Sequence, residues 1–87
     1  MIRLKIQIDI NKQDNDGRTA LMFAAFESNE KVMQYLCDTF KDTIDINKQN
    51  RYNNGETALM IAAEHNTNEK VIQYLCDTFK DTLDINI

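Results

Sequence analysis

The chain carries two near-copies of one segment, and this internal repeat constrains the fold more than any other feature. Residues 16–25, DGRTALMFAA, return as residues 54–63, NGETALMIAA, with an offset of 38 positions. Residues 30–43, EKVMQYLCDTFKDT, return as residues 69–82, EKVIQYLCDTFKDT, with an offset of 39. A period in this range is typical of a stacked array in which each unit buries its apolar face on the next. Function is therefore expected on a surface rather than in a deep cleft.

Each copy has the pattern of an arm, a turn and two helices. The alternating segments at 8–11, 44–47 and 83–86 predict extended arms, which run into turns at Gly17 and Gly55. Thr19 and Thr57 precede apolar runs and are suited to cap helix N-termini. The sequence thus predicts four helices, over about 19–27, 30–41, 57–65 and 69–80.

The second helix of each copy carries one apolar stripe at spacing i, i+4, i+8. It comprises Val32, Leu36 and Phe40, and then Val71, Leu75 and Phe79. Such a stripe predicts a buried face. Leu21 and Leu59 are predicted in the core, as are the gap-filling side chains of Met22, Met33 and Met60. Cys37 and Cys76 are expected to be buried on adjacent helices about 8–10 Å apart, too far for a disulfide.

The repeated motif resembles the ankyrin repeat, whose pattern is Asn-x-x-Asp-x-x-Gly-x-Thr-Pro-Leu-His-x-Ala-Ala. The first copy meets it at Asn11, Asp14, Gly17, Thr19, Leu21, Ala24 and Ala25, and the second at Asn47, Gly55, Thr57, Leu59, Ala62 and Ala63. Alanine replaces the family's proline, methionine replaces its histidine, and the second helix is about a turn longer. A helical-pair array of the HEAT type has a suitable period but lacks the alternating arm and the Gly-x-Thr turn.

The resemblance implies an all-α repeat solenoid of ankyrin-type helix-turn-helix units with extended β-hairpin-like arms. Residues 1–87 are expected to form one domain. Its units span about 8–43 and 44–82, and a partial third unit occupies 83–87.

Composition excludes several classes of function. The net charge is −4 and acids are interspersed with bases, so no basic stripe is present to neutralise nucleic-acid phosphates. No apolar run is long enough to span a membrane, and residues 1–10 lack the apolar core of a signal peptide. We expect a cytoplasmic protein, either of its own cell or of a host cell, without a cofactor.

Two motifs with chemical potential have simpler interpretations. Residues 14–17 resemble the middle of a calcium loop, but the loop's first and twelfth positions would fall on Lys12 and Phe23, so a turn is favoured. His65 is the only histidine, which leaves no pair of histidines for a metal site. A nucleophilic pair of His65 with Cys76 would need a thiol that the repeat pattern buries on another helix. No catalytic residue and no metal ligand is therefore predicted.

Positions at which the two copies disagree are the candidates for function, because core positions repeat. In ankyrin repeats the turn tips and the outward side of the first helix of each unit line the binding face, so the resemblance implies a binding role for these positions here. Two extra residues, near Arg51 and Tyr52, lengthen the second turn and add side chains enriched at binding hot spots. Neutral variation of a solvated surface explains any single difference equally well. The candidate partner-binding residues are Asn15, Asp16, Arg18, Phe26, Glu27, Arg51, Tyr52, Asn53, Asn54, Glu56, Glu64 and His65.

The predicted function is that of a protein–protein interaction module or scaffold, not an enzyme, which binds a protein partner through the turn tips and the first helices. The alternative is structural: a piece of a longer array, or a unit that forms a homo-oligomer through its exposed ends. The unbroken alternation from Ile2 to Ile10 predicts a longer strand than a repeat arm needs, and an apolar-faced edge of this kind favours self-association.

Overall fold

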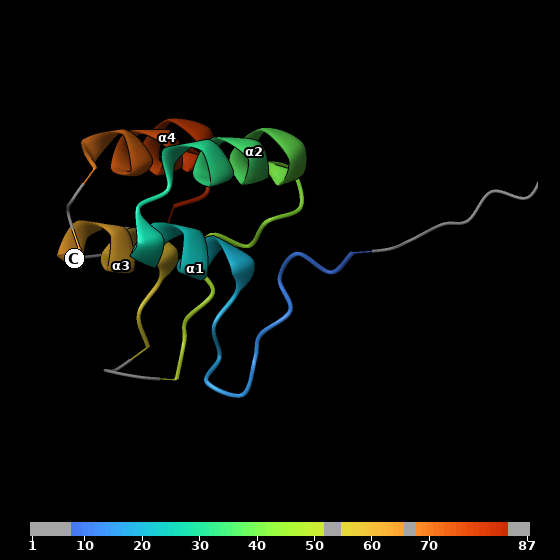
Figure 1. The fold of residues 1–87 in the computed structure, drawn as a ribbon. Helices are drawn as coiled ribbons and strands as arrows, with labels where there is room; N and C mark the ends of the chain where they lie inside the picture. Colours follow the sequence, from blue (N-terminus) through green and yellow to red (C-terminus); the bar gives the residue numbers. More distant parts are fainter. Residues whose placement is uncertain (1–7, 52–54, 66–67, 84–87) are drawn as a thin grey trace, which may run out of the picture.

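In the part of the chain that the structure describes, four helices form two stacked pairs (Figure 1). The computed structural model describes residues 8–51, 55–65 and 68–83. Its helices are α1 (Ala20–Glu27), α2 (Glu30–Phe40), α3 (Ala58–Glu64) and α4 (Glu69–Phe79). In space α1 lies beside α3 and α2 beside α4, which gives two layers of two helices. The four predicted helices are confirmed, each to within one residue at either end.

The helices begin where side chains cap them. The Thr19 hydroxyl accepts a hydrogen bond from the Met22 amide at 3.3 Å, and Thr57 does the same for the Met60 amide at 3.3 Å. Asn29 caps α2 by accepting from the Val32 amide at 3.2 Å. Each cap satisfies an amide that the first helical turn leaves without a partner. Thr57 thus stands at the start of α3 and not inside it, as predicted.

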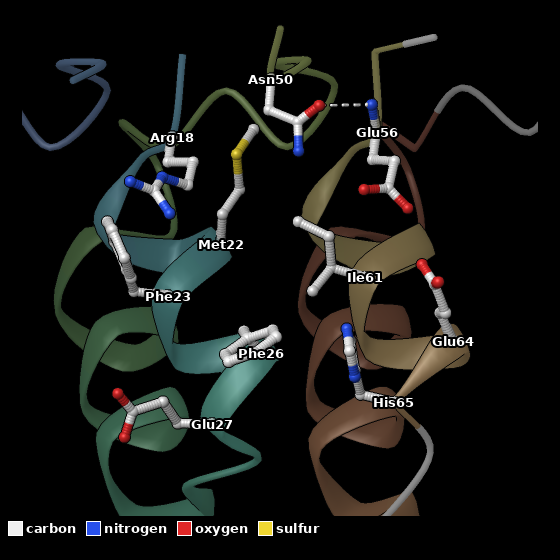
Figure 2. A pocket seen from close by; sticks show the side chains of 10 residues that line it. All are labelled: Arg18, Met22, Phe23, Phe26, Glu27, Asn50, Glu56, Ile61, Glu64 and His65. Atoms are coloured by element: carbon white, nitrogen blue, oxygen red, sulfur yellow. Dashed lines mark hydrogen bonds between the residues drawn. The ribbon is translucent and has the colours of Figure 1, made fainter. Parts of the chain in front are cut away.

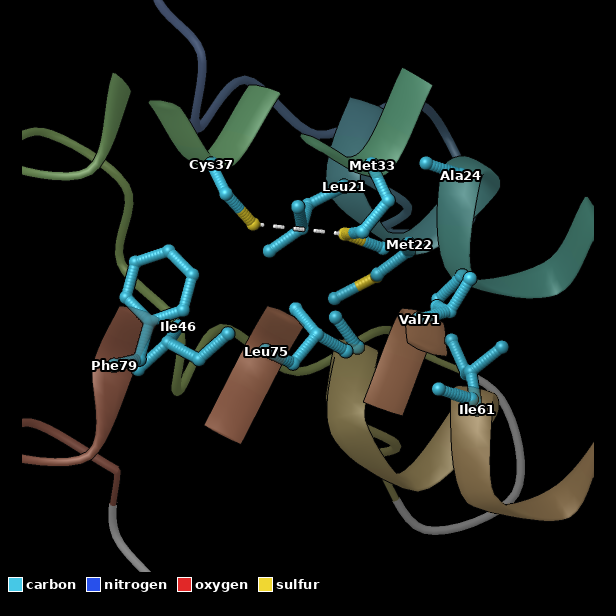
Figure 3. Packing of buried hydrophobic residues seen from close by; sticks show 13 residues of the cluster. Leu21, Met22, Ala24, Met33, Cys37, Ile46, Ile61, Val71, Leu75 and Phe79 are labelled. Atoms are coloured by element: carbon cyan, nitrogen blue, oxygen red, sulfur yellow. Dashed lines mark hydrogen bonds between the residues drawn. The ribbon is translucent and has the colours of Figure 1, made fainter. Parts of the chain in front are cut away.

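The core lies between the two helix pairs (Figure 3). The first pair contributes one face, which includes Met22, Met33 and Cys37, and the second pair contributes another, which includes Val71 and Leu75. Equivalent residues therefore differ in burial. Val71 is 1% exposed while its counterpart Val32 is 45% exposed. Met22 is 2% exposed while its counterpart Met60 is 53% exposed.

This asymmetry corrects part of the predicted core. Every unit of a stack has two apolar faces, one for each neighbour, and each pair here has a neighbour on one side only within the described residues. The predicted stripe is accordingly buried in α4, whereas in α2 Val32 is exposed and Leu36 and Phe40 are only half-buried. The predicted core residues that are exposed or only half-buried are Val32, Leu36, Phe40, Leu59, Met60 and Cys76.

The expected β-hairpin-like arms are wrong for the described residues, which contain no strand. The Asp9 carboxylate accepts a hydrogen bond from the Asn11 amide at 3.0 Å, and Asp45 does the same for the Asn47 amide at 3.1 Å. An aspartate side chain that accepts a hydrogen bond from the amide two residues later closes a tight turn. The alternating segments therefore do not form strands. Part of the predicted strand from 2 to 10 lies outside the described residues, namely 2–7, and residues 8–10 form no strand. Most of the predicted arm at 83–86, namely 84–86, also lies outside the described residues.

Asparagine side chains, rather than a strand ladder, connect one arm to the next. Asn11 Nδ2 donates to the Thr43 carbonyl at 2.9 Å, and Asn11 Oδ1 accepts from the Asp45 amide at 2.7 Å. Asn47 Nδ2 donates to the Thr82 carbonyl at 2.9 Å in the same way. The repeated bond fixes the spacing between units, and the described parts of both turns lie on the same side of the helices (Figure 1).

Candidate functional site

A groove of about 430 Å³ runs between α1 and α3, on the side away from α2 and α4 and next to the turn tips (Figure 2). Side chains of both helices and of the two turns line it. They are Arg18, Met22, Phe23, Phe26, Glu27, Asn50, Glu56, Ile61, Glu64 and His65.

The floor of the groove is apolar and its lower part is aromatic. Met22 and Ile61 are buried and separate the groove from the core. Phe26 of α1 meets His65, the residue that caps the end of α3, with ring centroids 4.5 Å apart and planes at 73°. Phe26 nevertheless stays 57% exposed, so most of its ring is open to a ligand. An exposed aromatic ring beside an apolar floor is suited to protein contact.

On the α1 side of the groove, Arg18 contacts two carboxylates and one aromatic ring. Arg18 Nε pairs with the Asp14 carboxylate at 3.1 Å, and Arg18 Nη2 pairs with Asp16 at 3.0 Å. The guanidinium carbon lies 4.9 Å from the centre of the Phe23 ring. The hydrogen bond from the Arg18 amide is the main cause that lowers the pKa of Asp14. The charge of Arg18 is therefore already balanced within the turn.

The α3 side of the groove carries two facing carboxylates. Glu56 stands just before α3 and Glu64 ends it, and their carboxyl groups point toward one another (Figure 2). A side-chain hydrogen bond with Glu56, together with its negative charge, raises the pKa of Glu64, while the neighbouring His65 acts in the opposite direction. No ion pair joins either glutamate to a lysine or arginine in the part of the chain that the structure describes. This side of the groove is therefore negatively charged and open.

The structure brings half of the predicted partner-binding residues together. Arg18, Phe26, Glu27, Glu56, Glu64 and His65 line the groove. Asn15, Asp16 and Arg51 lie at the turn tips, where Arg51 Nη1 donates to the Asn15 carbonyl at 3.3 Å and the Arg51 amide donates to the Asp16 carbonyl at 2.9 Å. Tyr52, Asn53 and Asn54 lie outside the described residues.

Four residues that line the groove are not among the predicted partner-binding residues: Met22, Phe23, Asn50 and Ile61. Phe23 and Ile61 are equivalent positions that differ between the copies, so the comparison used for the other candidates could have found them. Asn50 matches Asp14, and each accepts a hydrogen bond from the amide that leads into the following helix, Glu56 for one and Arg18 for the other, both at 2.9 Å. Met22 was assigned to the core, where it also belongs, because it forms the boundary between core and groove.

Among the described side chains, no three of His, Cys, Asp and Glu gather where they could hold a metal ion. None of the described helices has the length and apolar character needed to cross a membrane. Both cysteines are free, and burial raises the pKa of the Cys37 thiol, which disfavours the reactive thiolate.

Comparison with known proteins identifies one family. The family model described as ankyrin repeats, in three copies, matches residues 1–87. No curated protein matches the chain, and no solved structure does.

Proposed function

The chain belongs to the ankyrin repeat family, and from this premise we propose that it is a protein-binding module whose partner lies in the groove between α1 and α3 and against the turn tips. Ankyrin repeats generally mediate protein–protein interaction. The observation that carries the proposal is the groove itself, in which an exposed Phe26 stands over an apolar floor of Met22 and Ile61.

The proposal includes binding without catalysis. The side chains of the groove are aromatic, apolar and carboxylate groups, and its histidine is in contact with an aromatic ring. Such a set provides shape and charge for a partner segment. Two free thiols are in keeping with a reducing compartment, so we retain a cytoplasmic location as part of the proposal.

A peptide selection tests the binding face. The full chain is used to select from a phage-displayed library of random peptides, and the recovered peptides are synthesised and titrated by calorimetry. We expect Phe26→Ala to weaken their binding by about tenfold or more, because a buried aromatic anchor contributes at least ~2 kcal/mol at a hot spot.

Tyr35→Ala is the matched control for this test. Tyr35 lies on α2 and is 66% exposed, so it is an open aromatic residue like Phe26 but belongs to the other helix layer. Its replacement should leave the Kd of the selected peptides unchanged. A selection that yields no binder, or binders sensitive to Tyr35 and not to Phe26, would overturn the proposed function.

A second candidate function, self-association through the ends of the stack, is favoured by the burial asymmetry. Val32, Phe23 and Ala20 line a shallow hollow on the outer side of the first pair, while their counterparts Val71, Ile61 and Ala58 are buried against the neighbouring pair. At the opposite end Met60 is exposed where its counterpart Met22 is buried. The ends thus present the residue types that pack together in the middle, and apolar patches of this kind favour a partner.

Sedimentation equilibrium of the full chain tests this second candidate. We expect a concentration-dependent increase in mass that Val32→Asp abolishes, because a carboxylate in the contact would have to be buried without a partner. Gln34→Asp adds the same charge at an exposed position of the same helix and should leave the mass unchanged. A chain that remains monomeric at high micromolar concentration would contradict self-association.

A further inference from the structure

The two units differ in charge at equivalent positions of the groove. Arg18 in the first unit corresponds to Glu56 in the second, and Phe26 corresponds to Glu64. The first unit therefore supplies both a cation and the acids that surround it, whereas the second supplies two acids facing each other. The second half of the groove lacks the cation that the first half contains.

Arg18 shows which group this groove holds well. Its guanidinium is bound by two carboxylates, at 3.1 and 3.0 Å, and lies 4.9 Å from the centre of an aromatic ring. The planar guanidinium combines directed hydrogen bonds to carboxylates with stacking on an aromatic face, which an ammonium group does less well. The groove offers the same kinds of group a second time, with two carboxylates, Glu56 and Glu64, on the α3 side and an exposed ring, Phe26, on the facing α1.

We propose that the groove accepts an arginine side chain of the partner, with its guanidinium bound between Glu56 and Glu64 and its apolar stem along Ile61 and Phe26. The inference rests on the proposed function, since it specifies the partner of that same face. The hydrogen bond with Glu56 and then the negative charge of Glu56 raise the pKa of Glu64, and a cation between the two carboxylates relieves their repulsion. The net charge of −4 favours the approach of a basic segment as well.

The test uses the groove-binding peptides from the selection described above. We expect arginine to be enriched at one position of these peptides. Replacing it with citrulline, which keeps the shape and removes the charge, should weaken binding to the native chain by about tenfold or more. Replacement with lysine should weaken binding less than citrulline does, because the charge remains while the planar hydrogen-bonding geometry is lost.

The double variant Glu56→Gln/Glu64→Gln locates the effect. It should bind the arginine peptide about tenfold more weakly or worse, and it should no longer distinguish arginine from citrulline. Asp38→Asn/Asp77→Asn is the matched control, since it removes two charges from exposed equivalent positions of α2 and α4. The control should change the Kd by no more than about twofold, as expected for surface charges outside the contact.

The outcomes separate this inference from the function on which it rests. Peptides that lose affinity with Phe26→Ala but contain no arginine, or bind equally well as citrulline peptides, would overturn the arginine site and leave the binding face intact. Loss of affinity in the Asp38/Asp77 control equal to that in the Glu56/Glu64 variant would also overturn it, since general charge attraction would then explain binding. Failure to recover any groove-binding peptide would overturn both proposals.

Discussion

Replacing Leu75 with alanine is expected to remove a large part of the protein's free energy of unfolding. Leu75 is fully buried between the helix pairs, and such a truncation costs about 2–5 kcal/mol through lost burial and the cavity it leaves. A domain of 87 residues has a free energy of unfolding of about 4–13 kcal/mol, so the loss is a large part of the total. Urea denaturation followed by far-ultraviolet circular dichroism measures it.

Leu36→Ala is the matched control because Leu36 is the same residue at the equivalent position of α2. It packs only partly against the core, on the outer side of the first pair. Its truncation should therefore cost about 1 kcal/mol or less, in proportion to the smaller apolar area that it buries. Equal losses at the two positions would show that the burial asymmetry between the pairs is wrong, or that another chain covers the outer side of α2 in solution.

The helices could be predicted because their signals are local. Thr19 and Thr57 cap the helices that they precede, and the apolar residues between the caps follow the helical period. Both copies carry these signals, so the two repeats lead to the same prediction of helix bounds. The bounds of all four helices were consequently predicted to within one residue.

The burial of equivalent residues could not be predicted from the repeat alone. Val32 and Val71 have nearly identical sequence neighbours but opposite surroundings, since only one of them faces the other helix pair. Similarity between copies indicates which residues are able to pack, whereas position in the stack determines which do. The prediction of extended arms is wrong for a different reason. Alternation of Ile with Asp is a strand signal, but the aspartates here close turns.

The groove was predicted in outline through the resemblance, but its charge arrangement was not. Arg18 and Glu56 were both selected as positions that differ between the copies. The sequence does not reveal that Arg18 is bound by carboxylates of its own turn, while Glu56, just before α3, faces Glu64 at the end of α3. That distinction depends on which side chains meet in the folded structure, and the residue types alone do not determine it.

Replacing Gly17 with alanine is expected to cause a large loss of stability, which has two separate causes. Its φ of 76° is in the left-handed region, where an L-residue costs about 1–2 kcal/mol. An added Cβ would also stand 2.9 Å from the Arg51 amide nitrogen and 3.2 Å from the Asn50 carbonyl carbon, so the two turn tips would have to separate. Separation would break the hydrogen bond of 2.9 Å from the Arg51 amide to the Asp16 carbonyl, which costs about 0.5–1.5 kcal/mol more.

Gly55→Ala separates these two causes, because Gly55 also has a left-handed φ but does not lie against the backbone of another turn. Gly55 has a φ of 77°, but the three atoms nearest to a Cβ there all belong to the side chain of Gln49, at 3.2–3.3 Å, and that side chain can move. We therefore expect both variants to lower the free energy of unfolding, and Gly17→Ala to lower it by about 1 kcal/mol more. Equal losses in urea denaturation would mean that the tips are not held together in solution. Since Arg51 and Asn15 meet at the same contact, the selected peptides that touch the tips should also bind Gly17→Ala more weakly than Gly55→Ala.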